Sequence, residues 1–254
     1  MARTFLVTLH YDGGRFAGWQ RQAKGRTVQQ EVEAVLEQLC NGPVRVHAAG
    51  RTDAGVHAVG MATSCTLPDR WTGFRLVKSM NSLLPEDCWV ESVREMRPGF
   101  HARTRARGRR YRYVLGTDSG AASPFRRRYE WALGKSPDRA LLAAAAAAMV
   151  GEHDFAAFSV RRSPVRHRRS RIRLAQWAER PADTGLVFEI AADRFLHHMV
   201  RMLVGTMVDI GLGRRAPDDM TRLLELDPGV RTSPPAPAEG LYFVAADYPP
   251  EWYA

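Results

Sequence analysis

The sequence has few cysteines and no long hydrophobic run, and each shortage excludes a class of protein. Its 254 residues include three cysteines, Cys40, Cys65 and Cys88, which are widely spaced and form no CxxC pair. This pattern argues against a disulfide framework and against a zinc site. The longest apolar run, residues 140–150, is about half the roughly 20 residues that a membrane span requires. The N-terminus alternates like a strand rather than like a signal peptide, so we expect a soluble, cytoplasmic protein.

Negative charge and lysine are also scarce. The chain has 37 Lys and Arg against 27 Asp and Glu, a formal net charge of +10, and only three of the cations are lysines. Arginines gather in two blocks, residues 103–112 and 161–173. Such blocks are typical of phosphate-binding surfaces, although a solvated face or a GC-rich genome gives similar patterns. A nucleic acid is therefore the first partner to expect.

Hydrophobic periodicity predicts an α+β fold in the first part of the chain. Residues 5–11 alternate as a half-buried strand, and a capping box at Thr27 and Gln30 precedes an amphipathic helix over 28–39. The remaining predicted elements are strands at 44–48, 56–67 and 89–93 and a helix at 75–83. This β-α-β-β-α-β order is ferredoxin-like.

The second part of the chain repeats the theme. We expect strands at 110–115, 171–179, 186–192 and 241–245, helices at 138–150, 196–210 and 218–226, and a Pro-rich surface loop at 232–238. The prediction is two α+β units, 1–102 and 103–254, with a ligand-binding cleft between them.

One short segment favours catalysis. Asp53 lies in Gly50-Arg51-Thr52-Asp53-Ala54-Gly55, where two glycines flank a charged triplet. Glycine allows the backbone to approach a ligand closely, although an Asp near Gly more often forms an Asx turn or a helix cap. Arg201 lies within the apolar helix 196–210 and requires a partner there, for which Asp53 is a candidate. A paired, ionised Asp would suit nucleophilic catalysis, whereas an Arg201 that reaches solvent or phosphate would not serve this role.

The aromatic and histidine residues give weaker indications of function. Tyr111 and Tyr113 alternate with arginines in one predicted strand, so they either stack on an unpaired base or fill the core. His197 and His198 are adjacent, and we expect them to point about 100° apart on a helix. His57 and His101 are isolated. No metal site, nucleotide-binding motif or nucleophilic serine motif is indicated.

Taken together, the motifs resemble the tRNA pseudouridine synthase A (TruA) family. The matching segments span residues 3–249 in family order, and the segment GRTDAGVHA is the most specific of them. They are YDGGRFAGWQRQ (11–22) with TVQ (27–29), GRTDAGVHAVG (50–60), MNSLLPED (80–87), FHAR (100–103), RRYRYVL (109–115), FLHHMVRMLVG (195–205) and AEGLYFVAADYP (238–249). Met61 and the Arg-rich stretch 159–173 depart from the family pattern.

The resemblance implies two ferredoxin-like α+β halves that share one mostly antiparallel sheet, with a basic cleft between them. It implies that Asp53 is the catalytic carboxylate, that Arg51 enters the RNA and helps displace the target base, and that Tyr111 packs on the uracil. Arg201 is then the partner of the carboxylate and Leu241 an apolar wall of the pocket. The implied partners are tRNA, at positions 38, 39 and 40 of the anticodon stem-loop, and a second copy in a homodimer. No cofactor is implied.

The chemistry is consistent with these residues. Uridine and pseudouridine are isomers, so the reaction breaks the N-glycosidic bond, turns the uracil and rejoins it through carbon 5 without redox or energy input. The target base must first leave the stack. Asp53 has three possible roles, which are attack on the ring, attack on the sugar, and removal of a sugar proton. Two other functions stay open, a catalytically silent RNA-binding protein and a glycosidic hydrolase that pairs Asp53 with Glu86 or Asp87.

Overall fold

The computed structural model describes residues 2–159 and 168–254, and it divides the chain into two compact units. The first unit comprises Met1–Arg109 with Tyr242–Ala254, and the second comprises Arg110–Leu241. The fold is α+β, with one large mixed and mostly antiparallel sheet. The C-terminal segment belongs to the first unit because the last strand pairs with a strand of that unit, and the predicted functional division at residue 102 stays a prediction.

The first unit contains the predicted β-α-β-β-α-β order. Its strands are hydrogen-bonded in the order β4-β1-β3-β10, and the short β2 also pairs with β3. β1 is antiparallel to both β3 and β4, whereas β10 is parallel to β3. The elements are β1 (Ala2–Tyr11), α1 (Val28–Cys40), β2 (His47–Ala48), β3 (His57–Pro68), α2 (Gly73–Asn81), β4 (Cys88–Met96) and β10 (Leu241–Asp247).

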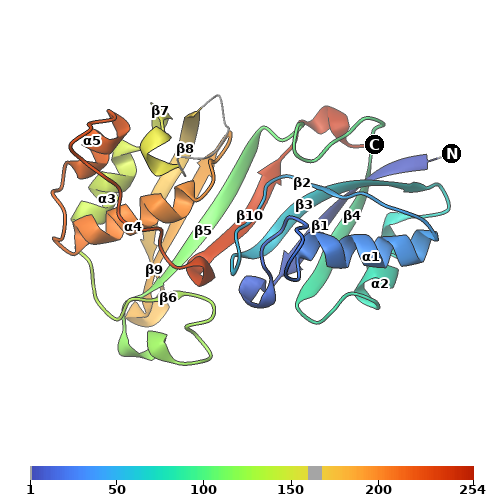
Figure 1. Ribbon diagram of the computed structural model, residues 1–254, viewed down its shortest axis with the longest axis horizontal. Coiled ribbons are helices and arrows are strands. Elements are labelled where there is room, and N and C mark those ends of the chain that lie inside the picture. The colour runs from blue at the N-terminus through green and yellow to red at the C-terminus, as the bar shows by residue number, and fades with distance from the viewer. Residues whose placement is uncertain (1, 160–167) are drawn as a thin grey trace. The chain divides into compact units, whose positions relative to one another are not determined.

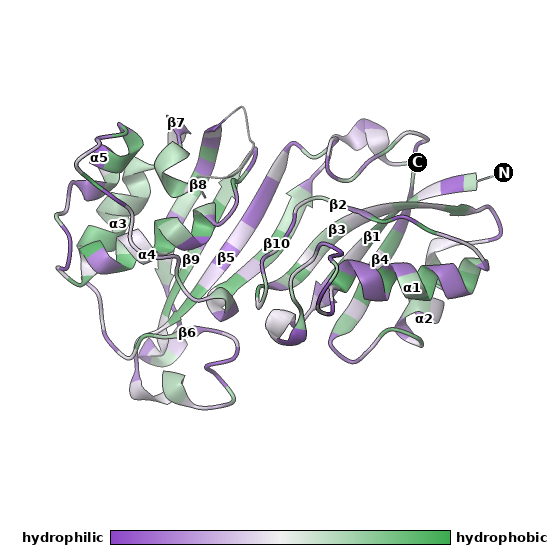
Figure 2. Ribbon diagram, in the orientation of Figure 1, coloured by the Kyte–Doolittle hydropathy of each residue, from purple (hydrophilic) through white to green (hydrophobic). Residues whose placement is uncertain are grey.

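Helix α1 forms where its capping box and its apolar stripe predict it. The hydroxyl of Thr27 accepts a hydrogen bond from the backbone N–H of Gln30 and donates one to the Gln30 side chain at 2.7 Å. Val32 and Leu36 are buried on one face of α1, and Figure 2 shows hydrophilic and hydrophobic bands along this helix. Helices α1 and α2 contact each other, and α2 packs against β4 (Figure 1). The sheet residues Phe5, Val7 and Leu9 complete this core.

The second unit has the strand order β5-β9-β8-β7, with β6 paired to β5. Its helix α3 contacts both α4 and β8. The elements are β5 (Gly108–Gly116), β6 (Trp131–Ala132), α3 (Arg139–Ala148), β7 (Gly151–Asp154), β8 (Arg169–Glu179), β9 (Gly185–Ala192), α4 (Met199–Gly211) and α5 (Asp219–Leu224). Short 3-10 helices lie at Gly13–Arg15, Ser119–Ala122, Ala156–Phe158, Pro181–Asp183, Ala238–Gly240 and Pro250–Trp252.

Two predictions for the second unit need correction. The helix predicted from residue 196 begins at Met199, because His198 adopts a left-handed backbone conformation with φ of 63°. The predicted surface loop 232–238 exposes Pro234 and Pro235 but buries Ala236. The N–H of Ala236 donates to the carbonyl of Arg201 at 2.9 Å, so this loop is fixed on α4. Within residues 2–159 and 168–254, no helix is both long enough and apolar enough to cross a membrane.

Candidate functional site

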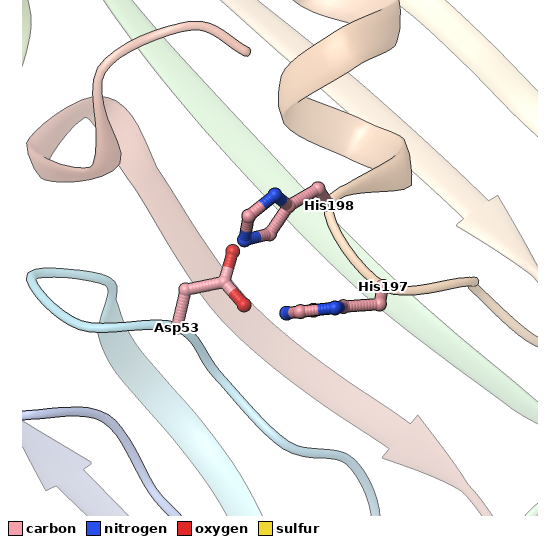
Figure 3. A group of neighbouring side chains, drawn as sticks. All are labelled: Asp53, His197 and His198. Carbon is pink, nitrogen blue, oxygen red and sulfur yellow. The ribbon is translucent and has the colours of Figure 1, made fainter. Parts of the chain in front are cut away.

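Asp53 lies on a tight turn between β2 and β3 of the first unit, and Figure 3 shows its side chain on this loop. The turn is closed by the backbone, because the N–H of Val56 donates to the carbonyl of Asp53 at 3.2 Å. Gly55 has φ of 80°, a left-handed conformation that glycine adopts without strain. The Asp53 side chain is half-buried and the neighbouring Arg51 is exposed. The loop therefore presents both charged side chains rather than packing them in the core.

Residues 11–19 pack against the Asp53 loop and hold its backbone in place. The N–H of Trp19 donates to the carbonyl of Thr52 at 3.0 Å, and the Thr52 hydroxyl lies 2.8 Å from the hydroxyl of Tyr11. Gly18 has φ of 103°, and a Cβ atom there would lie 2.8 Å from the Thr52 carbonyl oxygen. At Gly13 a Cβ atom would lie 2.1 Å from the Val56 carbonyl oxygen. Both glycines allow a contact that a larger residue would prevent.

His57, which is isolated in the sequence, supports the same loop. Its imidazole is buried, and its Nδ1 accepts a hydrogen bond from the N–H of Gly13 at 3.1 Å. The ring stacks on Tyr242 with a centroid distance of 4.9 Å, and Asp12 lies 3.2 Å from Nδ1. His57 thus connects the turn at Gly13 to the start of β3. A signal was present in the sequence, since His57 lies only four residues after Asp53 in the same motif.

The alternative roles for Asp53, an Asx turn or a helix cap, lose support. An Asx turn at Asp53 would use the N–H of Gly55, but that N–H donates to the carbonyl of Phe16 at 3.4 Å. No helix begins at Asp53, since the turn leads into β3. Backbone hydrogen bonds at Thr52, Asp53 and Gly55 therefore account for much of the loop conformation.

The hydrolase hypothesis also loses support, because Glu86 and Asp87 bind arginines. Arg26 donates two hydrogen bonds to Asp87, at 2.6 and 2.8 Å, and Arg15 forms an ion pair with Glu86. The hydrogen-bonded Arg26 guanidinium lowers the pKa of Asp87 from its ordinary value, despite an opposing effect of burial. A glycosidase acid requires a raised pKa instead.

The second unit holds Tyr111, Tyr113 and Leu241, all of them buried. Tyr111 meets Phe195 edge to face, with ring centroids 4.9 Å apart. Tyr113 donates a hydrogen bond to the carbonyl of Pro237 at 2.9 Å, and its ring would lie within 2.6 Å of a Cβ atom at Gly240. Burial raises the pKa of the Tyr113 phenol. Tyr113 thus fills the core beside the start of β10, where Leu241 lies.

Arg201 lies on α4, as predicted, and is partly buried. Its Nε donates to the carbonyl of Ala236 at 2.7 Å, so the side chain binds the 232–238 loop. Its pairing with Asp53 stays a prediction. The preceding turn carries His197 and His198 (Figure 3), whose ring centroids lie 4.1 Å apart. The prediction that these two side chains diverge on a helix is wrong, because α4 begins after them.

Several arginines of the two blocks bind other groups of the same chain. Arg109 donates to the carbonyls of Ala49 and Arg103, which ties the chain before β5 to the residue preceding the Asp53 motif. Arg105 lies over the ring of Trp252 at 4.3 Å. In the second block, Arg169 and Arg171 both pair with Glu152. Arg161, Arg162 and Arg166 of that block lie outside the described residues.

Comparison with known proteins gives consistent matches. A family model described as tRNA pseudouridine synthase matches residues 8–103 and 145–249. The tRNA pseudouridine synthase A of Solidesulfovibrio magneticus is 42% identical over 98% of this chain and 92% of its own length. That of Moorella thermoacetica is 40% identical over 95% of this chain and 98% of its own. The segments that match the family model include Arg51, Asp53, Arg201 and Leu241, whereas Tyr111 lies between the two matched segments.

Proposed function

The chain belongs to the TruA family of tRNA pseudouridine synthases and is an isomerase, and from this premise we propose that it converts uridine to pseudouridine in the anticodon stem-loop of tRNA. The proposed target positions are 38, 39 and 40. Asp53 is the proposed catalytic carboxylate. The proposed assembly is a homodimer in the cytoplasm.

The observation that carries this proposal is the construction of the Asp53 loop. Backbone hydrogen bonds hold the loop at Thr52, Asp53 and Gly55, the side chain of His57 accepts a bond from the N–H of Gly13, and Gly13 and Gly18 allow the backbone to approach the loop closely. A carboxylate on a rigid, backbone-held turn is positioned for chemistry at low cost when the substrate arrives. An RNA-binding protein without activity would gain nothing from an acidic side chain presented beside an exposed arginine, since RNA repels it.

The other predicted residues receive roles in the same proposal. Arg51, exposed beside Asp53, enters the space that the flipped base leaves. Tyr111 packs on the uracil and Leu241 forms an apolar wall, while Arg201 holds the carboxylate in its ionised form. The uracil ring separates from carbon 1′ at nitrogen 1, turns, and bonds through carbon 5. Carbon 5 loses its proton and nitrogen 1 gains one, so no cofactor is required for atom balance.

Release of tritium from carbon 5 of uracil tests the proposal. Tritium at that carbon must leave as water when the new bond forms, so a tRNA transcript labelled there reports each turnover. We expect release by the wild type and a loss of at least about 10²-fold in Asp53→Asn, the usual scale of a proton-transferring or nucleophilic group. Glu225→Gln, which removes one exposed negative charge elsewhere, is the matched control and should retain full release.

The same experiment separates the alternatives. If the wild type binds tRNA tightly but releases no tritium, the silent RNA-binding function replaces the proposed one. If Asp53→Asn lowers the melting temperature in parallel with activity, the carboxylate has a structural role. Loss of turnover with unchanged melting and unchanged tRNA affinity is the expected result.

A further inference from the structure

A basic and aromatic loop of the second unit lies away from the residues discussed so far. This loop, residues 123–130, has the sequence SPFRRRYE, and we refer to it as the Phe125 loop. Phe125 is 87% exposed, the highest value among the large hydrophobic residues of the described chain, and Tyr129 is 41% exposed. Arg127 and Arg128 are exposed between them, and the Arg128 guanidinium lies 5.7 Å from the Tyr129 ring centre. The loop thus displays rings and cations together.

The Phe125 loop is ordered by its inward-facing residues. Arg126 donates two hydrogen bonds to Asp118, at 2.7 and 2.8 Å, and one to the carbonyl of Thr184 at 3.1 Å. Glu130 is buried and forms ion pairs with Arg126 and Arg180. The hydrogen-bonded Arg126 lowers the pKa of Asp118, so this contact persists at neutral pH. Phe125 is therefore exposed on a loop that these contacts hold in one conformation.

Backbone bonds add to this rigidity. The N–H groups of Arg126 and Arg127 both donate to the carbonyl of Ser123, and that of Tyr129 donates to Arg126. A pre-ordered loop loses little conformational entropy when it binds a partner. An isolated exposed phenyl ring is common on protein surfaces, but a ring on an ordered loop beside two exposed arginines matches the combination that binds single-stranded nucleic acid, with stacking on a base and contacts to phosphates.

We propose that the Phe125 loop is an RNA-binding surface at which Phe125 stacks on an unpaired base of tRNA while Arg127 and Arg128 bind the flanking phosphates. This proposal rests on the proposed function, because tRNA is the proposed substrate. The Phe125 loop lies within residues 104–144, between the two segments that match the family model. Charge favours RNA over a second copy of the chain, since a two-fold contact would place the arginines of both copies together in a protein of net charge +10.

Binding of an unmodified tRNA transcript to Phe125→Ala tests the stacking. Loss of one base–aromatic stack should weaken binding roughly tenfold and raise KM, with kcat unchanged at saturating tRNA. Phe125→Trp should restore the affinity. Phe74→Ala is the matched control, because Phe74 is 81% exposed on α2 of the first unit. Equal affinity of the Phe125→Ala and Phe74→Ala variants would overturn the proposal.

The salt dependence of the same binding tests the arginines. Neutralising both in the Arg127→Gln/Arg128→Gln variant should reduce the magnitude of the slope of log K against log salt by about 1.4 to 1.8. An unchanged slope would contradict phosphate binding by these residues. The binding measurements do not require turnover, so they remain decisive even if the wild type releases no tritium and the proposed function fails.

A photoreactive benzoyl-phenylalanine at position 125 separates RNA from a protein partner. We expect irradiation of the complex with tRNA to give a protein–RNA adduct that maps to an unpaired nucleotide. A protein–protein adduct, or loss of a dimer by light scattering in Phe125→Ala, would show instead that this loop joins two copies of the chain. Either of those two results overturns the proposal.

Discussion

The position of Asp53 depends on single residues that are distant from it in the sequence. Gly13 and Gly18 lie about forty residues before it, yet their missing side chains allow the backbone to contact residues 52–56. His57 then fixes Gly13 through a hydrogen bond to a buried ring nitrogen. Each of these groups acts on the backbone of the loop and leaves its side chains available.

His57 should behave as a positioning residue. His57→Leu removes the acceptor for the buried Gly13 N–H, so we expect the free energy of unfolding to fall by about 2 kcal/mol and kcat to fall while the KM for tRNA is unchanged. His57→Asn places an acceptor near the position of Nδ1 and should restore much of both losses. Urea unfolding and steady-state tritium release measure the two effects. A His57→Leu variant with unchanged kcat would leave His57 a purely structural residue.

At the scale of single residues, the sequence suggested candidate site residues but missed the groups that hold their loop in place. Asp53, Arg51 and Arg201 are recognisable because charged residues near glycines or within an apolar helix are unusual. His57 was missed, because its hydrogen-bond partner is 44 residues away and no local pattern predicts that contact.

At the scale of elements, the turn at Gly18 connects the entry to α1 with the Asp53 loop. Gly18→Ala requires a left-handed alanine and places a Cβ atom 2.8 Å from the Thr52 carbonyl oxygen. We expect a loss of about 2 kcal/mol or more in the free energy of unfolding and a fall in turnover, because the loop must move. Gly42→Ala is the control, since nothing lies within 4 Å of a Cβ atom there. Equal melting temperatures for the two variants would show that the close contact is unimportant.

Most elements were predicted correctly in type, and the differences have local causes. Thr27 caps α1 as its sequence indicates, because the capping box is a contact between residues three apart. The start of α4 was predicted three residues too early, since the apolar pattern continues through Leu196 but His198 turns the backbone to the left-handed region. The strand β6 is two residues long and β7 is four, so neither shows a periodic pattern.

At the scale of the whole molecule, the pH dependence of the free energy of unfolding should report on the ion pair between Asp87 and Arg26. Hydrogen bonds from Arg26 lower the pKa of Asp87 in the folded protein. Its stabilising contribution is therefore complete above the ordinary pKa of aspartate, near 3.8, and is lost as the pH falls through the lowered value. We expect Asp87→Asn to reduce the free energy of unfolding by about 2 kcal/mol at pH 7.

The difference between Asp87→Asn and the wild type should shrink as the pH falls below 4, because the wild-type carboxyl then loses its own charge. Urea unfolding at pH 7 and pH 3 measures this difference in the free energy of unfolding. Glu225→Gln, which removes an exposed charge, should show little difference at either pH. A constant difference for Asp87→Asn across this range would mean that packing, rather than charge, explains its effect.

The pairing of β10 with β3 has a consequence for synthesis on the ribosome. The first unit takes residues 242–247 of β10 from the segment that follows the whole second unit in the sequence. A nascent chain that has released its first 109 residues still lacks this strand, so β3 keeps an unpaired edge at Ala58 until residue 243 emerges. The unit that is translated first is thus completed last, and the edge of β3 is the surface that a co-translational chaperone would have to protect.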